Sequence, residues 1–305
     1  MKKNKGNINM RVSLLKTSIL LVFACLGITI HSACSLNRIV INAAGGFMES
    51  GIQSVYSEGD LELAENFLAS NLKMIEILAS KDTSNTQMNL LAAQTFGAYS
   101  MAFVEDENPE RASALYKRGL AYSFRSLPPK KRFNEQITID QLENLLPNFT
   151  QDDVPALFWI GYNWGQFILQ HLDDPMTIVH LSKVEMIMRR VMELDESYNF
   201  AGVDLFYGCF YAARPPFLGG NPEKGRQFFE RNNELNGNSF LMSQFFMAKY
   251  YAVQMQDRKL FESLLTEIDQ ADIDARPDIR LMNALAKEKA AKLRLMEADL
   301  FDTGE

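Results

Sequence analysis

Residues 198–235 read YNFAGVDLFYGCFYAAR (198–214), PPFLGGN (215–221) and PEKGRQFFERNNEL (222–235). In the first part, apolar residues recur three and four positions apart, which is typical of a helix that packs against neighbours. The second part holds two prolines and two glycines, which interrupt helices and favour turns. The third part begins with a proline followed by an acid, a combination favoured in the first turn of a helix. The stretch therefore predicts two helices joined by a turn as a hairpin.

The same helical pattern continues along the chain beyond residue 57, and no sustained alternation of the strand type is present. Asn108-Pro109 and Arg276-Pro277 predict further helix starts, and Pro128-Pro129 predicts a stop. Residues 130–151 are the least regular and predict a long connection with one short helix near Gln141–Leu146. The predicted helices are Leu61–Ala79, Thr86–Val104, Pro109–Ser126, Val154–Leu172, Met176–Leu194, Tyr198–Arg214, Pro222–Leu235, Phe240–Met255, Arg258–Ala271 and Pro277–Leu300.

A weak internal repeat supports hairpins of similar length. Similar strings end three predicted helices at Glu193, Glu234 and Glu267, at intervals of 41 and 33 residues. The second interval is close to the ~34 residues of a tetratricopeptide unit. The prediction is therefore an all-α, tetratricopeptide-like solenoid of helical hairpins, with about ten helices, over residues 58–305. A non-repetitive helical bundle is the alternative.

Composition and charge exclude two classes of protein. With 47% of its 305 residues hydrophobic, the chain has ample material for a core, which excludes wholesale disorder. Five of the 31 basic residues and none of the 38 acids precede Cys34, which leaves 26 against 38 and a net charge of −12 beyond it. So acidic a body argues against nucleic acid as a partner, because phosphate contacts need clustered Lys and Arg.

The N-terminus has the layout of a bacterial export signal: a basic start, an uncharged run of 14 residues over Thr17–Ile30, and small residues before Cys34. The run is shorter than the ~20 residues that a membrane-spanning helix needs. Ser32-Ala33-Cys34 resembles a lipobox, which predicts a lipoprotein signal peptide over 1–33, lipidation of Cys34 and a tether over 34–57. Cleavage before Cys25 and an ordinary unacylated signal peptide are the alternatives.

Several segments together resemble the TatT family, the T component associated with TRAP (tripartite ATP-independent periplasmic) transporters. The turn PPFLGGNPEK, residues 215–224, is the most specific of them. The resemblance covers nearly all of the mature chain and is strongest over 159–289, whereas His31 and residues 130–151 depart from it. The segments are Cys34–Asn37, Tyr99–Val104, Pro215–Lys224, Lys249–Gln254 with Gln256–Arg258, and Leu281 with Asn283–Ala286.

The resemblance implies a periplasmic lipoprotein with a tetratricopeptide-like fold, anchored by its lipid to the inner or the outer membrane. It further implies self-association, with a trimer expected, and binding of the transporter's solute-binding protein. A pore or cavity in each protomer, suited to an apolar or organic-anion ligand, is also implied. No cofactor or metal is expected.

Aromatic residues of the predicted helix over 154–172 are the first candidates for a binding site. Trp159, Tyr162 and Trp164 lie where this helix is apolar on nearly every side. Either they fill the core between hairpins, or a Trp lines a ligand channel.

Two cations on apolar helices also have two interpretations each. Arg214 ends a helix in step with Tyr207, and it either interacts with exposed carbonyls at the helix end or binds a ligand carboxylate. Lys249 lies beside Tyr250, and either its long stem reaches water from an apolar face or it too binds a ligand carboxylate.

The Pro/Gly turn supplies the last candidates. Phe217 and Leu218 either fold back onto the following helix or contact a partner or a channel rim. The candidate ligand- or partner-binding residues are Trp159, Tyr162, Trp164, Tyr207, Arg214, Phe217, Leu218, Lys249 and Tyr250.

Catalytic motifs are scarce, so an enzyme is not expected. His171 and His180 have no recognised ligand spacing, and no Walker A loop, nucleophile elbow or HExxH motif occurs. Two rival functions are a tetratricopeptide scaffold for envelope assembly without a small ligand, and a helical envelope enzyme such as a lytic transglycosylase. The second would need a lysozyme-like domain, whereas the sequence beyond Pro222 predicts only more hairpins.

Overall fold

A computed structural model describes residues 43, 45–52 and 54–301. The chain divides into two compact units, Met1–Phe47 and Met48–Glu305, and the description below concerns the second unit. The predicted signal peptide and Cys34 lie outside the described residues. No helix in the described ranges combines the length and the hydropathy that crossing a bilayer requires.

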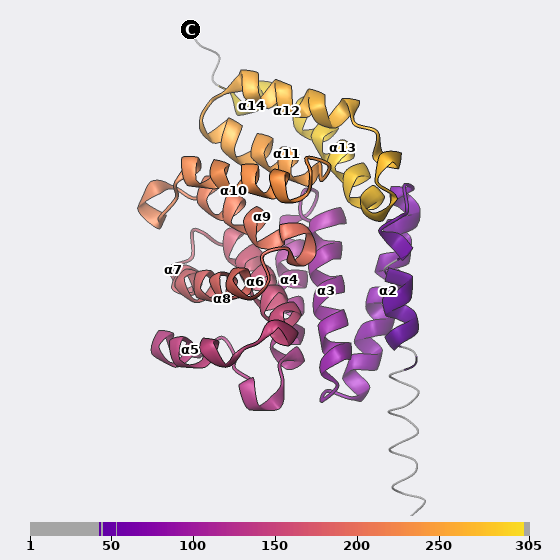
Figure 1. Cartoon of the computed structure of the whole chain (residues 1–305), viewed down its shortest axis with the longest axis vertical. Coiled ribbons are helices and arrows are strands. Elements are labelled where there is room, and N and C mark those ends of the chain that lie inside the picture. The colour runs from indigo at the N-terminus through magenta and orange to yellow at the C-terminus, as the bar shows by residue number, and fades with distance from the viewer. Residues whose placement is uncertain (1–42, 44, 53, 302–305) are drawn as a thin grey trace, which may run out of the picture. The chain divides into compact units, whose positions relative to one another are not determined.

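The second unit is built from helices, and the described residues contain no strand, which confirms the all-α prediction (Figure 1). Residues 48–52 and 54–55, which fall in the predicted tether, are helical. The helices that follow are α2 (Leu61–Lys81), α3 (Thr86–Phe103), α4 (Pro109–Ser126), α5 (Ile139–Leu145), α6 (Val154–Leu169), α7 (Pro175–Ile178), α8 (Leu181–Leu194), α9 (Tyr198–Ala212), α10 (Pro222–Leu235), α11 (Met242–Phe246), α12 (Arg258–Gln270), α13 (Arg280–Leu295) and α14 (Glu297–Leu300).

Local capping explains why several helices begin where the sequence predicts. The side chain of Asn108 accepts a hydrogen bond from the Arg111 amide at 2.9 Å, and Asn221 accepts one from the Lys224 amide at 3.0 Å. Each satisfies an amide that would otherwise lack a partner at the helix start. In both cases the next residue is a proline, whose fixed φ suits the first helical turn. The bounds of α4 and α10 therefore match the prediction.

Three predicted helices are interrupted. The predicted helix Met176–Leu194 is divided into α7 and α8. The predicted helix Phe240–Met255 is α-helical over α11 and then continues as a π-helix over Met247–Ala252. The predicted helix Pro277–Leu300 starts with a 3₁₀ turn over Pro277–Ile279 and is split near Met296 into α13 and α14.

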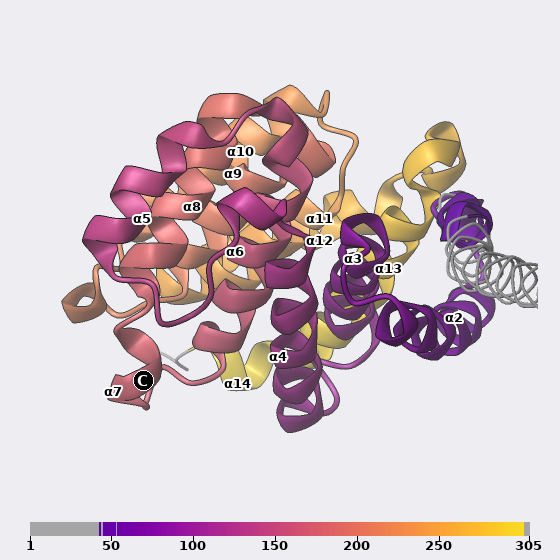
Figure 2. The ribbon, with the colours of Figure 1, turned by 90° about the horizontal axis from the view of Figure 1, so that it is seen from below.

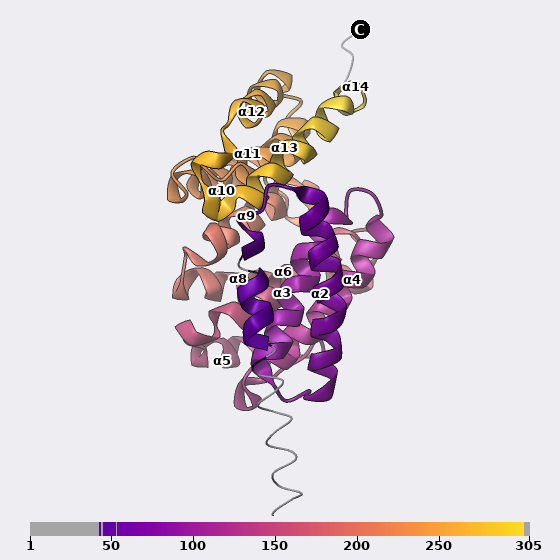
Figure 3. The same ribbon diagram turned by 90° about the vertical axis from the view of Figure 1, so that its right-hand side faces the viewer.

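Consecutive helices pack as hairpins, and the last hairpins return to the first. The pairs α3–α4 and α9–α10 have the most extensive contacts, and α6 packs on both α4 and α8 (Figures 1 and 2). At the other end of the chain α13 contacts α2, as Figure 3 also shows. The Leu281 amide donates to the Tyr56 carbonyl at 3.0 Å. The stack of hairpins is therefore closed, and this closure encloses a space between the helices.

The α9–α10 hairpin has almost no free space between its two backbones. A Cβ atom placed on Gly225 would lie 2.8 Å from the Gly208 carbonyl oxygen and 3.0 Å from the Ala212 Cβ. Since one obstacle is backbone, rotation of a side chain cannot relieve the overlap. The hairpin that identified the fold in the sequence therefore requires glycine at this position.

We predict that Gly225→Ala lowers the free energy of unfolding by about 1–3 kcal/mol, because α9 and α10 must separate to admit the methyl group. The better helix propensity of Ala, about 1 kcal/mol, offsets only part of this loss. Urea unfolding followed by circular dichroism measures the change. Gln227→Ala on the exposed side of α10 is the control, expected within about 0.5 kcal/mol of wild type. Equal stability of the two variants would contradict the prediction.

Candidate functional site

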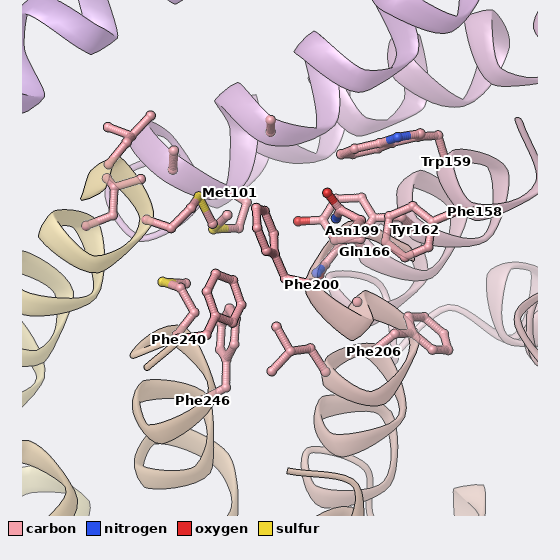
Figure 4. Close-up of a pocket in the computed structure, with 18 of the residues that line it drawn as sticks. Met101, Phe158, Trp159, Tyr162, Gln166, Asn199, Phe200, Phe206, Phe240 and Phe246 are labelled. Carbon is pink, nitrogen blue, oxygen red and sulfur yellow. The ribbon is translucent and has the colours of Figure 1, made fainter. Parts of the chain in front are cut away.

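A cavity lies between α3, α6, α9, α11 and α13, with a volume of ≈ 110 Å³ measured to the centre of a water molecule. One water occupies only about 10–15 Å³ on this measure, so the space suits a small organic molecule. Aromatic side chains from several helices line it (Figure 4). The labelled residues of its wall are Met101, Phe158, Trp159, Tyr162, Gln166, Asn199, Phe200, Phe206, Phe240 and Phe246.

The wall of the cavity is uncharged. Among the described residues that line it, none is Asp, Glu, Lys, Arg or His. The groups that can ionise are held neutral: burial raises the pKa of Tyr162 well above its usual value, and it also raises the pKa of the Cys209 thiol. An ionic ligand would therefore find no counter-charge on this wall, whereas apolar surface would be well matched.

A left-handed turn shapes one side of the cavity. Asn199, Phe200 and Ala201 have φ angles of 52°, 61° and 53°, so right-handed helix begins only after them although α9 starts at Tyr198. This conformation is costly for Phe and Ala, about 1–2 kcal/mol each. It places Asn199 beside Tyr162 and Gln166, and Phe200 against Phe240 with ring centroids 5.1 Å apart (Figure 4).

Asn232 in α10 and Asn236 at its C-terminal cap hold this turn. The Asn232 side-chain amide donates to the carbonyls of Phe200 and Ala201 at 2.8 and 2.9 Å. The Asn236 amide donates to the Phe200 carbonyl at 2.9 Å. Asn232 is fully buried, so its hydrogen bonds are shielded from water. These bonds give the carbonyls of the left-handed turn additional side-chain donors.

Trp159 separates the cavity from a second, more polar hollow. Both spaces share Tyr56, Trp159 and Phe200, and the second adds polar side chains such as Gln94 and Thr95. The Trp159 ring packs edge-on against Phe158 and Tyr162 at 5.3 and 5.2 Å. Its buried Nε1 makes no hydrogen bond of normal geometry with the described residues, although the Tyr198 hydroxyl is near enough to interact with it.

An ionic cluster closes the opposite side. Ala102 and Leu285 line both the cavity and a polar pocket that contains Asp106 and Lys289. Asp106 forms ion pairs with Lys249, at 2.8 Å, and with Lys289. Burial would raise the pKa of Asp106, but the two lysines hold it below its usual value. The cluster links the α3–α4 turn to the π-helix and to α13.

Glu105 lies beside this cluster. It accepts a hydrogen bond from the Tyr116 hydroxyl at 2.6 Å. Burial raises the pKa of Glu105 above its usual value, against the opposing effect of Lys289 and Lys249. A charge at this position is therefore less stable than on an exposed Glu.

The structure brings two of the predicted site residues, Trp159 and Tyr162, to the cavity. Trp164 lies elsewhere, fully buried with Phe124 at 5.7 Å and His180 at 5.0 Å. Tyr207 donates to the Glu185 carbonyl at 2.9 Å and stacks on Phe228.

Arg214 does not line the cavity, and neither do Lys249 and Tyr250, the two candidates in the π-helix. The Arg214 guanidinium is buried and donates to the carbonyls of Phe210, Leu218 and Gly219 at 2.6, 2.9 and 3.4 Å. This is the capping geometry of a cation at a helix end. Lys249 is occupied by Asp106, and Tyr250 lies behind Phe246, with ring centroids 6.0 Å apart.

The two apolar residues of the turn before α10 differ in how far they are exposed to solvent. Phe217 is 84% exposed, and Leu218 is half-buried. Met176 and Val179 around α7 are also largely exposed, at 75% and 60%.

Most residues of the cavity wall could not be recognised from the sequence. Phe158, Phe200, Phe240 and Phe246 line the cavity but fall within stretches whose pattern predicts only apolar helices. One local signal was present for Phe200: it follows Asn199, and Asn is one of the few residues that tolerate a left-handed conformation. The other phenylalanines have no signal that distinguishes a cavity wall from a filled core.

We predict that Asn232→Ala lowers the free energy of unfolding by about 1–3 kcal/mol, because it leaves buried carbonyls of the left-handed turn with fewer donors. Urea unfolding monitored by circular dichroism gives the magnitude. Glu234→Ala, an exposed change on the same helix, should stay within about 0.5 kcal/mol of wild type. Wild-type stability in the Asn232 variant would show that the turn is held by other contacts.

Comparison with known proteins places this architecture in a family. The family model described as "TAtT: TRAP transporter T-component" matches residues 57–301. A protein of Treponema pallidum (strain Nichols), described as uncharacterized, is 24% identical over 313 aligned positions, which cover 92% of this chain and 96% of that protein.

Proposed function

Because this chain belongs to the TRAP transporter T-component family, we propose that it is a lipid-anchored periplasmic accessory protein of a TRAP transporter. In this proposal it binds the solute-binding subunit and holds an apolar ligand in the cavity behind Trp159. The observation that carries the ligand assignment is the cavity with an uncharged, largely aromatic wall. Lipidation at Cys34 and assembly into a homo-oligomer, with a trimer expected, belong to the same proposal.

The cavity favours an apolar ligand over an organic anion. A carboxylate moved from water to this wall would lose its hydration without gaining a counter-charge. Arg214, the sequence-based candidate for binding a carboxylate, already donates to three carbonyls. Lys249 already pairs with Asp106. A ligand with predominantly apolar bulk fits the site best.

The partner surface is proposed at the turn before α10. An exposed Phe on a short turn that Arg214 rigidifies is typical of an anchor residue at a protein interface. Because this turn lies outside the cavity wall, partner binding and ligand binding are separable by mutation.

We predict that Ala98→Phe, which fills the cavity, weakens binding of neutral N-phenyl-1-naphthylamine at least about tenfold, a loss near 1.4 kcal/mol. Fluorescence titration measures the affinity. Ala114→Phe on the exposed face of α4 is the matched control and should bind as wild type does. Decanol should displace the probe more strongly than decanoate. Stronger displacement by decanoate would overturn the apolar assignment.

We also predict that Phe217→Ser weakens binding to the solute-binding protein of the same transporter by about tenfold or more. Calorimetry of the two purified proteins gives the dissociation constant. Leu295→Ser removes an equally exposed apolar residue, 88% exposed on α13, and should leave the affinity unchanged. Absence of binding even for the wild-type pair at high micromolar concentration would favour the envelope-assembly scaffold instead.

A further inference from the structure

One part of this acidic chain is strongly basic. Residues 109–133, which cover α4 and the segment after it, contain seven cations and a single acid, Glu110. The cations are Arg111, Lys117, Arg118, Arg125, Lys130, Lys131 and Arg132. Four of them, Arg125 and residues 130–132, lie at the C-terminal end of α4, and they are called the basic edge below.

The cations of the basic edge are held in position with most of their charge available. Arg125, Lys130 and Arg132 are exposed. The Arg125 guanidinium lies 5.3 Å from the Tyr122 ring centroid, and Arg132 donates to the carbonyls of Leu127 and Arg125. In the described ranges no carboxylate forms an ion pair with any of these three exposed cations, whereas Lys131 pairs with Asp153 at 2.5 Å. Clustered like charges without counter-charges favour an anionic partner.

The chain enters the helical body at this same edge. Glu49 accepts a hydrogen bond from Gln87, in the first turn of α3, at 3.2 Å. Since α3 and α4 are antiparallel neighbours, the start of α3 lies beside the end of α4. Figure 1 shows the α2–α3 turn and the segment after α4 together at the lower end.

The chain between Cys34 and Met48 is short enough to keep the basic edge near a lipid anchor at Cys34. Met48 follows Cys34 by 14 residues, which span at most about 50 Å when fully extended. This step rests on the anchoring at Cys34 that is part of the proposed function. Such a tether holds the basic edge at a high effective concentration near the bilayer, so each contact can be weak.

We propose that the basic edge is a membrane-contact surface that binds the phosphate groups of anionic phospholipids and orients the helical body on the bilayer. The apolar side chains around it, Tyr122, Leu127 and Phe133, are buried. The edge therefore offers charge without the apolar centre of a protein interface. Clustered Lys and Arg beside an anchor are the feature that anionic lipid surfaces attract.

The test is hydrogen–deuterium exchange of the full chain, read on peptides from residues 120–135. The chain is mixed with vesicles of phosphatidylcholine alone, or of phosphatidylcholine with phosphatidylglycerol. With anionic vesicles we expect exchange at least about fivefold slower, the factor that matches about 1 kcal/mol for one cation near an anionic surface. The effect should disappear at high salt, because the Debye length falls to about 3 Å at 1 M.

Variants make the test specific. Lys130→Glu/Arg132→Glu should lose the protection, whereas Lys259→Glu/Arg294→Glu, the same charge change at exposed positions of α12 and α13, should keep it. Slow exchange in α6 confirms that each variant is folded. Equal exchange with both vesicle types, or equal loss in both variants, would overturn the proposal.

The outcomes also separate this proposal from its rivals. Protection of residues 120–135 by the solute-binding protein but not by anionic vesicles would make the edge a protein interface instead. Failure of the Phe217 titration leaves the vesicle result unchanged, so the two proposals fail independently.

Discussion

The arrangement of the cavity depends on one strained turn. Residues 199–201 adopt a left-handed conformation that costs about 1–2 kcal/mol each for Phe200 and Ala201, and hydrogen bonds from Asn232 and Asn236 hold them there. Asn232 belongs to α10 and Asn236 caps its C-terminal end, and the backbone of α10 is pressed against α9 at Gly225. The aromatic wall, the turn and the α9–α10 hairpin are therefore one packed unit. A change in the spacing of the hairpin would move Phe200 in the cavity.

On the side of the cavity opposite the left-handed turn, a different kind of interaction joins the helices. There the contacts are ionic, and they join the α3–α4 turn to the π-helix and α13 through Asp106, Lys249 and Lys289. These partly exposed pairs contribute little net stability, but Lys289 is buried, so an arrangement that separated it from Asp106 would leave a buried charge unpaired. The apolar packing near α9 therefore supplies stability, whereas the ionic cluster specifies how the last hairpins meet the first. The uncharged cavity lies between these two regions.

A structural feature could be predicted from sequence when the residues that cause it lie next to it in the chain. The starts of α4 and α10 are determined by Asn-Pro pairs at the starts themselves, and their bounds matched. Trp159 and Tyr162 could be selected because their helix is apolar on nearly every side. The wall at Phe200 could not be derived, because its backbone is held by asparagines more than 30 residues later. The hydrogen bonds of Arg214 likewise depend on the fold of the turn that follows it.

The π-helix at Met247–Ala252 has a consequence for the ancestry of these hairpins. A π-helical turn contains one residue more than the α-helical turn it replaces, so it accommodates a single-residue insertion without disturbing the hairpins on either side. Duplicated units that differ by such an insertion no longer match residue for residue, although their helices still superpose. If repeats are aligned without gaps inside helices, each residue beyond Met247 is paired with one that lies about 100° away around the helix axis. The weak periodicity of this sequence is therefore compatible with a regular set of duplicated hairpins.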